Sequence, residues 1–169
     1  DGIIGFVRNK HISDSYYESI ESSFEEPKYV QTKKNTPINL VWHQVTNQTA
    51  NNNLLVDLEG TKGITTISPT WYSIIDNDGS ISSLASESYV ERAHSQGLEV
   101  WGLVDDFNPD IDIVRVLSYT SSREKLINEL IASAIKYNLD GINIDFERIP
   151  QAGGIHFIQF IRELSIRCR

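Results

Sequence analysis

One stretch of the sequence decides the predicted fold: Asp140-Gly141-Ile142-Asn143-Ile144-Asp145-Phe146-Glu147. From Ile142 onward its side chains alternate between apolar and polar, and successive side chains of a β-strand point to opposite faces. Asn143, Asp145 and Glu147 therefore share one face of a predicted strand. The Cα atoms of the two carboxylate residues lie about 6.6 Å apart at ~3.3 Å per residue. Both carboxylates can thus reach one bond of a substrate, which is the arrangement that acid–base chemistry needs.

An alternating strand of this kind also occurs in antiparallel sheets that have one face in solvent. The flanking sequence favours a parallel sheet, because amphipathic helical patterns lie on both sides of the strand. The stripe before it consists of Leu126, Ile127, Leu130, Ile131, Ala134 and Ile135, and the stripe after it of Phe157, Ile158, Ile161, Leu164 and Cys168. Ser121 and Glu124 have the spacing of a capping box, and Asn138 is a candidate left-handed helix stop. We therefore expect a parallel sheet covered by helices.

Similar patterns occur upstream. Residues 38–45, 63–74 and 98–104 read as strands, and residues 86–96 as a helix that stops at Gly97. The polar segment 46–62 is expected to be a loop with one short helix around residues 54–58, and Asp78-Gly79 a turn. The predicted order is four βα units, which is the connectivity of half a (β/α)8 barrel or of a smaller doubly wound sheet.

The quoted stretch resembles the signature of glycoside hydrolase family 18, the chitinase-like hydrolases, whose fourth barrel strand reads Asp-Gly-x-Asp-x-Asp-x-Glu. The departure is Asn143, where Asp is commoner. Residues 37–42, 68–72 and 100–103 look like the branch of this family found in spore-forming and related bacteria, which acts on peptidoglycan. The resemblance covers about residues 37–169, and it implies an α/β fold, a TIM barrel of which this chain carries the first four βα units.

The resemblance also implies roles. The family uses retaining catalysis in which the substrate supplies the nucleophile. Glu147 would be the general acid, Asp145 would orient the 2-acetamido group and stabilise the cyclic intermediate, and Asn143 would hydrogen-bond Asp145 from below. Asp140 and Gly141 would be structural. Such a site needs no metal or other cofactor.

Further candidates lie at the ends of the other predicted strands. Trp42, Trp71, Tyr72 and Trp101 could stack on sugar faces, with Trp71 the best placed because it falls late in its strand; core packing is the alternative. Asp105 and Asp106 end the third strand, where a barrel has its catalytic mouth, although they could equally be solvated loop carboxylates. The family often has Ser-x-Gly-Gly on that strand, where this chain reads Gly102-Leu103-Val104-Asp105-Asp106. His43 is expected to be a satisfied strand histidine, since the four histidines have no metal-binding spacing.

The chain is shorter than a whole barrel. A complete (β/α)8 barrel takes about 250 residues, and this sequence has 169 with no Met. We expect residues 37–169 to be the N-terminal half of a catalytic barrel, inactive by itself. Residues 1–36 differ in composition and are expected to be a linker or the remnant of an upstream module, with residues 2–7 as one short strand. The exposed edge of the fourth strand would favour self-association.

Composition restricts the partners. The 15 Lys and Arg against 23 Asp and Glu give a net charge of −8, which disfavours nucleic acid and anionic membranes. No apolar run reaches the ~18 residues of a membrane span. The single cysteine, Cys168, forms no internal disulfide. The resemblance alone implies an extracellular protein associated with the cell wall or the spore.

Three functions follow. The leading one is hydrolysis of β-1,4 bonds next to N-acetylglucosamine in peptidoglycan or chitin-like polymers. The second is a non-catalytic, lectin-like relative that binds the same polysaccharide. The third is a different barrel enzyme in which Asp105, Asp145 and Glu147 hold a divalent metal.

Overall fold

The computed structural model describes residues 5–14, 16–19, 23 and 34–169. The chain divides into two compact units, Asp1–Val30 and Gln31–Arg169. In the first unit the described residues include one short 3-10 helix, η1 (Asn9–His11). The strand expected at residues 2–7 lies partly outside the described residues, and residues 5–7, which are described, are not in a strand.

The second unit contains a mainly parallel sheet. Its strands β1 (Leu40–His43), β2 (Thr66–Ile74), β4 (Glu99–Asp105) and β5 (Gly141–Asp145) lie in that order and run parallel. A short strand, β3 (Ile81–Ser83), pairs antiparallel with the end of β2. The four predicted strands are confirmed, with later starts for the first two. The sequence does not predict β3, because three residues are too few to show an alternation.

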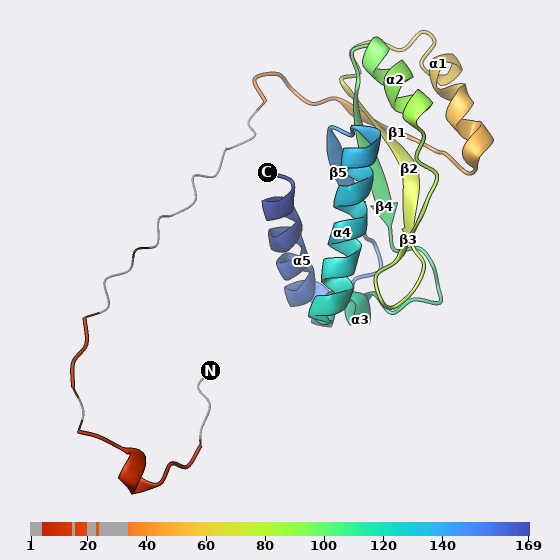
Figure 1. Ribbon diagram of the computed structural model, residues 1–169. Coiled ribbons are helices and arrows are strands. Elements are labelled where there is room, and N and C mark those ends of the chain that lie inside the picture. The colour runs from red at the N-terminus through yellow and green to blue at the C-terminus, as the bar shows by residue number, and fades with distance from the viewer. Residues whose placement is uncertain (1–4, 15, 20–22, 24–33) are drawn as a thin grey trace. The chain divides into compact units, whose positions relative to one another are not determined.

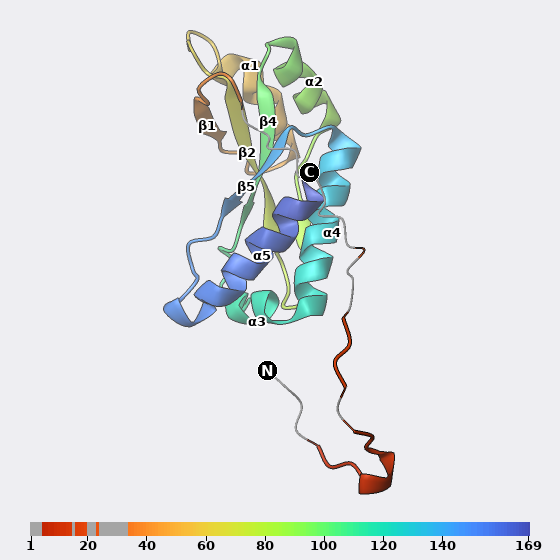
Figure 2. The same ribbon diagram turned by 90° about the vertical axis from the view of Figure 1, so that its left-hand side faces the viewer.

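Each parallel strand is followed by helix. The elements are η2 (Gln48–Asn53) and α1 (Leu54–Asp57) after β1, α2 (Glu87–Ser95) after β3, α3 (Ile113–Ser118) and α4 (Thr120–Tyr137) after β4, and η3 (Gln151–Gly153) and α5 (Gly154–Arg167) after β5. Figure 1 shows α4 and α5 side by side, and Figure 2 shows the strands on the left with α2 and α4 on the right. The long helices therefore cover one face of the sheet (Figure 1 and Figure 2). No helix of the described ranges is long and apolar enough to cross a bilayer.

The start of α4 differs from the prediction. The capping box at Ser121 is wrong, because Thr120 is already helical and the N-cap residue, Tyr119, makes no side-chain cap. Instead the Arg123 guanidinium donates to the carbonyl oxygens of Leu117 (2.8 Å) and Ser118 (3.1 Å). These are the last carbonyls of α3, so one buried cation joins the two helices where a local cap was expected.

Arg123 also joins α4 to α5. Its Nε and Nη2 donate to the Glu163 carboxylate at 3.0 and 3.1 Å, and this hydrogen bonding lowers the pKa of Glu163. The other end of α4 is as predicted: Asn138 adopts φ 54°, ψ 49° and stops the helix. The predicted apolar stripe is confirmed at Leu126, Ile127 and Leu130, which are buried, whereas Ile135 is 77% exposed.

The core lies between the sheet and the helices. Val100 and Val104 of β4 are fully buried there together with Tyr89, Leu126 and Leu130 of the helices. The side chains of Ile142 and Ile144 on β5, and of Phe146 just after it, pack against this core. Since neighbouring side chains of a strand point to opposite faces, Asn143 and Asp145 face away from the helices. The predicted alternation of β5 is thus confirmed.

Two residues attach the start of β5 to β4. The Asp140 carboxylate accepts hydrogen bonds from the Val100 backbone N–H and from His94 Nε2, both at 2.8 Å. Gly141 lies directly against the Trp101 ring, and a Cβ added there would be 2.8 Å from the indole. Both contacts are structural, and they set the register in which Trp101 pairs with Gly141.

This close approach yields a stability prediction. Gly141→Ala should lower the free energy of unfolding by about 1–3 kcal/mol, because the methyl group overpacks the Trp101 ring. Urea denaturation measures the change. Gly154→Ala is the matched control, since a Cβ there meets no atom within 4 Å. Equal stability of the two variants would contradict the packing role of Gly141.

Candidate active site

The face of the sheet opposite the helices carries the candidate site. Register places Trp42 beside Ser68, Leu103 beside Asn143, and Asp105 beside Asp145, and registered residues of parallel strands point to the same face. The strands are about 4.8 Å apart. Asp105 and Asp145 thus stand next to each other at the carboxyl ends of β4 and β5, the edge at which α/β barrels place their chemistry.

Glu147 lies two residues beyond Asp145, just after β5 ends. It is exposed and Asp145 is half-buried. In the part of the chain that the structure describes, no group donates a hydrogen bond to the Glu147 carboxylate. This carboxylate is therefore available to a ligand, as a general acid must be.

Asp105 is held by its own surroundings. Ser73 Oγ donates to its Oδ2 at 2.8 Å, and the Phe107 backbone N–H donates to its Oδ1 at 3.0 Å. Its half-buried carboxylate still faces the site. Ser73 was not among the predicted site residues, because an isolated serine in a strand carries no signal until the strand's partner is known.

Asp106 differs from the prediction. It was expected to bind substrate or to be a solvated loop residue, but its side chain is 0% exposed. Its Oδ1 accepts the Glu147 N–H and its Oδ2 the Arg148 N–H, each at 3.0 Å. The carboxylate therefore holds the backbone of the neighbouring loop and cannot touch a sugar in this structure.

Asn143 is anchored from β2. Its Nδ2 donates to Ser68 Oγ at 3.1 Å, and Ser68 Oγ donates to the Trp101 carbonyl at 2.8 Å. The hydrogen bond expected between Asn143 and Asp145 is not formed among the described residues. Asn143 of β5 is thus linked to Ser68 of β2 across β4, and Ser68 is linked to the β4 backbone at Trp101, so that β2, β4 and β5 share one chain of hydrogen bonds.

Trp71 and Tyr72 also differ from the prediction. Trp71 is 2% exposed, and its Nε1 donates to Asn51 Oδ1 at 2.8 Å. Tyr72 is 1% exposed, and its hydroxyl is hydrogen-bonded to Ser133 Oγ at 2.7 Å. The register with β4 shifts between Thr70 and Tyr72, and such a bulge re-aims side chains in a way that plain alternation does not predict. Both rings belong to the core and cannot stack on a ligand.

Trp42 and Trp101 are the predicted aromatics on the site face; Trp101 is half-buried against Gly141, and Trp42 is the more exposed of the two. It is 68% exposed, and it shares the sheet face of Ser68 and Asn143. Its neighbour His43 points the other way, with Nδ1 2.8 Å from the Tyr89 hydroxyl and Nε2 3.0 Å from Asp57 Oδ2. His43 is thus a satisfied strand histidine, as predicted. No group of three or more metal-ligating side chains occurs within the described ranges.

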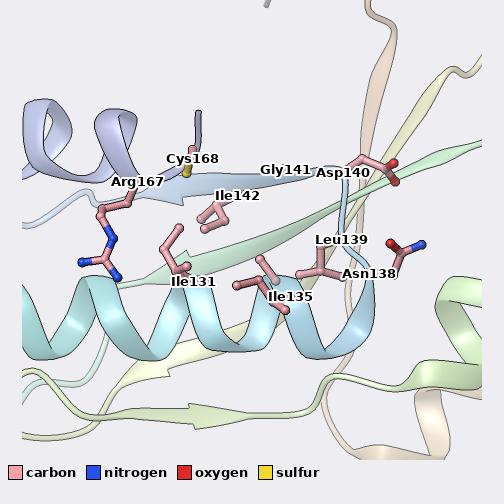
Figure 3. A pocket seen from close by; sticks show the side chains of 10 residues that line it. Ile131, Ile135, Asn138, Leu139, Asp140, Gly141, Ile142, Arg167 and Cys168 are labelled. Atoms are coloured by element: carbon pink, nitrogen blue, oxygen red, sulfur yellow. The ribbon is translucent and has the colours of Figure 1, made fainter. Parts of the chain in front are cut away.

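A pocket of about 420 Å³ lies elsewhere, between α4 and α5. Figure 3 shows Ile131, Ile135 and Ile142 around it, with Arg167 and Cys168 on the α5 side. It opens at the start of β5 and on the helix face, because Ile142 points toward the helices. It is therefore separate from the carboxylates, which lie at the other end and on the other face of β5.

Solved structures with a similar fold are chitinases and related enzymes. They include the C-terminal domain of a proposed chitinase from Desulfitobacterium hafniense (22% identity, TM-score 0.66, 78% of this chain and 42% of that one). The spore cortex-lytic enzyme SleL of Bacillus cereus matches at 15% identity and TM-score 0.61, over 77% and 32% of the two chains. A family 18 chitinase from Cycas revoluta, solved with (GlcNAc)3, matches at 13% identity and TM-score 0.61, over 77% and 40%.

These matches show that the chain shares the α/β fold of chitinase domains, at low sequence identity. The chain spans about two fifths of the length of the first of these structures. The sequence itself matches no protein-family model and no curated protein.

The burial of Tyr72 yields a pH prediction. Burial raises the pKa of its hydroxyl to about 12, although the hydrogen bond with Ser133 opposes this shift. The unfolded chain releases this proton nearer pH 10, so stability should fall as the pH rises from about 10 to 12.

Tyr72→Phe should remove the part of this fall that Tyr72 contributes, about 1.4 kcal/mol for each unit of pKa difference. The part that comes from Tyr89, whose pKa burial also raises, should remain. Urea denaturation at pH 8, 10 and 11 measures it. Tyr119→Phe is the control, because Tyr119 is exposed. An alkaline loss of stability that is the same in Tyr72→Phe and in the unmodified chain would contradict the assignment.

Proposed function

We propose that this chain is the N-terminal half of the (β/α)8 barrel of a family 18-like glycoside hydrolase. The observation that carries the proposal is the exposed carboxylate of Glu147, to which no described group donates a hydrogen bond, two residues beyond Asp145 at the carboxyl end of β5. The fold of the chitinase structures supports it. In a whole barrel the edge of β5 would pair with a further strand; in the isolated chain the same edge would favour self-association.

The proposed reaction is cleavage of a β-1,4 bond next to N-acetylglucosamine with retention of configuration. Glu147 gives its proton to the leaving glycosidic oxygen while the carbonyl oxygen of the substrate's own acetamido group attacks C1. Asp145 orients the acetamido group and stabilises the positive ring that forms. Glu147 then takes a proton from water as the water opens this ring and restores the acetamide.

The other site residues have supporting roles. Trp42 offers an exposed aromatic face on which a pyranose can stack. Asp105, fixed by Ser73, contributes a further acceptor for sugar hydroxyls. Asn143 supports the strand through Ser68 and not through Asp145.

We propose a substrate that contains N-acetylglucosamine, either peptidoglycan or chitin. A solved structure of similar fold holds (GlcNAc)3, and another is a spore cortex-lytic enzyme. An extracellular location at the cell wall or spore would give access to such a polymer. No metal is assigned a step.

A non-catalytic sugar-binding protein is the second candidate. The observation that favours it is the small aromatic surface: of the four predicted stacking residues, only Trp42 is exposed, and Trp101 is half-buried. Such a protein would bind the sugar polymer without cleaving it, and this distinguishes it from the hydrolase.

The first functional prediction concerns Glu147. In the full-length natural protein, Glu147→Gln should lower kcat on chito-oligosaccharides or peptidoglycan by about 10²–10⁴, because the proton donor is lost. NMR of the first product of the unmodified protein should show the β-anomer. Glu87→Gln, on the exposed start of α2, is the control and should keep full activity. Sugar binding without cleavage by the unmodified protein would favour the second candidate.

The second functional prediction separates two tryptophans. Trp42→Ala should raise the Kd for a chito-oligosaccharide about 5- to 50-fold, through the loss of about 1–2 kcal/mol of stacking and buried area, with little change in stability. Trp71→Ala should instead destabilise the fold by about 3–5 kcal/mol, because its ring fills the core. Calorimetric titration and urea denaturation measure the two effects. An unchanged Kd in Trp42→Ala would remove Trp42 from the site.

A further inference from the structure

The carboxylate of Asp106 is a buried charge between the ends of two strands. It is 0% exposed, and it follows Asp105, the last residue of β4. Its two oxygens are used separately, Oδ1 by the Glu147 N–H and Oδ2 by the Arg148 N–H, at 3.0 Å each. A buried charge is tolerated where hydrogen bonds replace its hydration, and here those bonds all hold the segment that carries Glu147.

The Arg148 side chain in turn binds the backbone that follows Asp106. Its Nη1 donates to the Asn108 carbonyl at 2.8 Å and to the Phe107 carbonyl at 3.4 Å. We call this set the β4–β5 clasp: the Asp106 and Arg148 side chains with the backbone of Glu147, Phe107 and Asn108. Each of the two segments therefore supplies one charged side chain that binds the backbone of the other.

The clasp lies just beyond the end of the pairing between β4 and β5. The β4–β5 ladder ends at the pair Asp105 and Asp145, and Glu147 lies two residues beyond it. The Glu147 side chain has no hydrogen bond to hold it in the described part of the chain. Its position therefore depends on its backbone, and the hydrogen bond to Asp106 Oδ1 is the contact that fixes that backbone.

We propose that Asp106 is a positioning residue, which places the Glu147 carboxylate at the glycosidic oxygen without itself touching the substrate. This inference rests on the proposed function of Glu147. It also explains the chemistry of the position: only a carboxylate presents an acceptor to both N–H groups, whereas an Asn side chain would turn its NH₂ group toward one of them. A misplacement of about 1 Å at a catalytic group can cost about 100-fold in rate.

The test uses two substrates in the full-length natural protein. A chito-oligosaccharide has a poor leaving group, which needs the proton of Glu147, whereas a dinitrophenyl glycoside of N-acetylglucosamine loses its phenolate without protonation. We expect Asp106→Asn to lower kcat on the oligosaccharide by about 100-fold with little change in KM. The rate of the initial dinitrophenolate burst should differ by less than about threefold between Asp106→Asn and the unmodified protein. Glu147→Gln should likewise lose activity on the oligosaccharide and keep its burst on the dinitrophenyl glycoside.

A second variant guards against a folding defect. Arg148→Ala removes the exposed side chain of the clasp. It should lower kcat on the oligosaccharide about tenfold and leave the dinitrophenolate burst nearly unchanged. Leu130→Ala is the matched control: it removes a fully buried side chain of α4, a helix that contributes no residue to the clasp. It should lower stability in urea without any split between the two substrates.

The outcomes separate the two hypotheses. If the unmodified protein cleaves both substrates and Asp106→Asn loses the two activities equally, in step with its stability, Asp106 is merely structural and the proposed function stands. Full oligosaccharide activity in Asp106→Asn also overturns the positioning role. An unmodified protein that cleaves neither substrate overturns the proposed function, and the positioning role with it.

Discussion

The packing of one face of β5 against the helices is the constraint on which the candidate site depends. Ile142, Ile144 and Phe146 are drawn to the core, since burial of such side chains contributes roughly 1.5–3 kcal/mol each. A strand that turns these residues inward must turn Asn143 and Asp145 outward. The polar face is thus held in place by apolar contacts on the reverse side, and a slip of one residue would exchange the two faces.

Hydrogen bonds made by side chains then align the strands across the polar face. Ser68 connects β2 to Asn143 of β5, Ser73 connects β2 to Asp105 of β4, and Asp106 connects the end of β4 to the segment after β5. Three separate hydrogen-bonded contacts thus join the neighbouring strands of the candidate site. Contacts of this kind restrict the positions of the groups beside them, which suits the acid role proposed for Glu147.

Errors of the sequence-based reading occur where tertiary contacts replaced local ones. The capping box at Ser121 competes with Arg123, whose guanidinium serves the last carbonyls of α3. Trp71 and Tyr72 lie at a bulge, where strand alternation no longer tells which way a side chain points. Asp106 reads as a loop carboxylate until its two backbone partners, about forty residues later in the chain, are known.

The sequence by itself determined the four βα units, the helix stop at Asn138 and the common face of Asn143 and Asp145, because periodicity and backbone conformation are local properties. Tertiary structure alone decided which candidates meet at the site. Trp42 and Asp105 face it, Trp71 and Tyr72 are buried beneath it, and Asp106 holds it together. The physical reason is that burial and hydrogen bonding between strands depend on register and on bulges, which arise only when segments distant in the chain pack together.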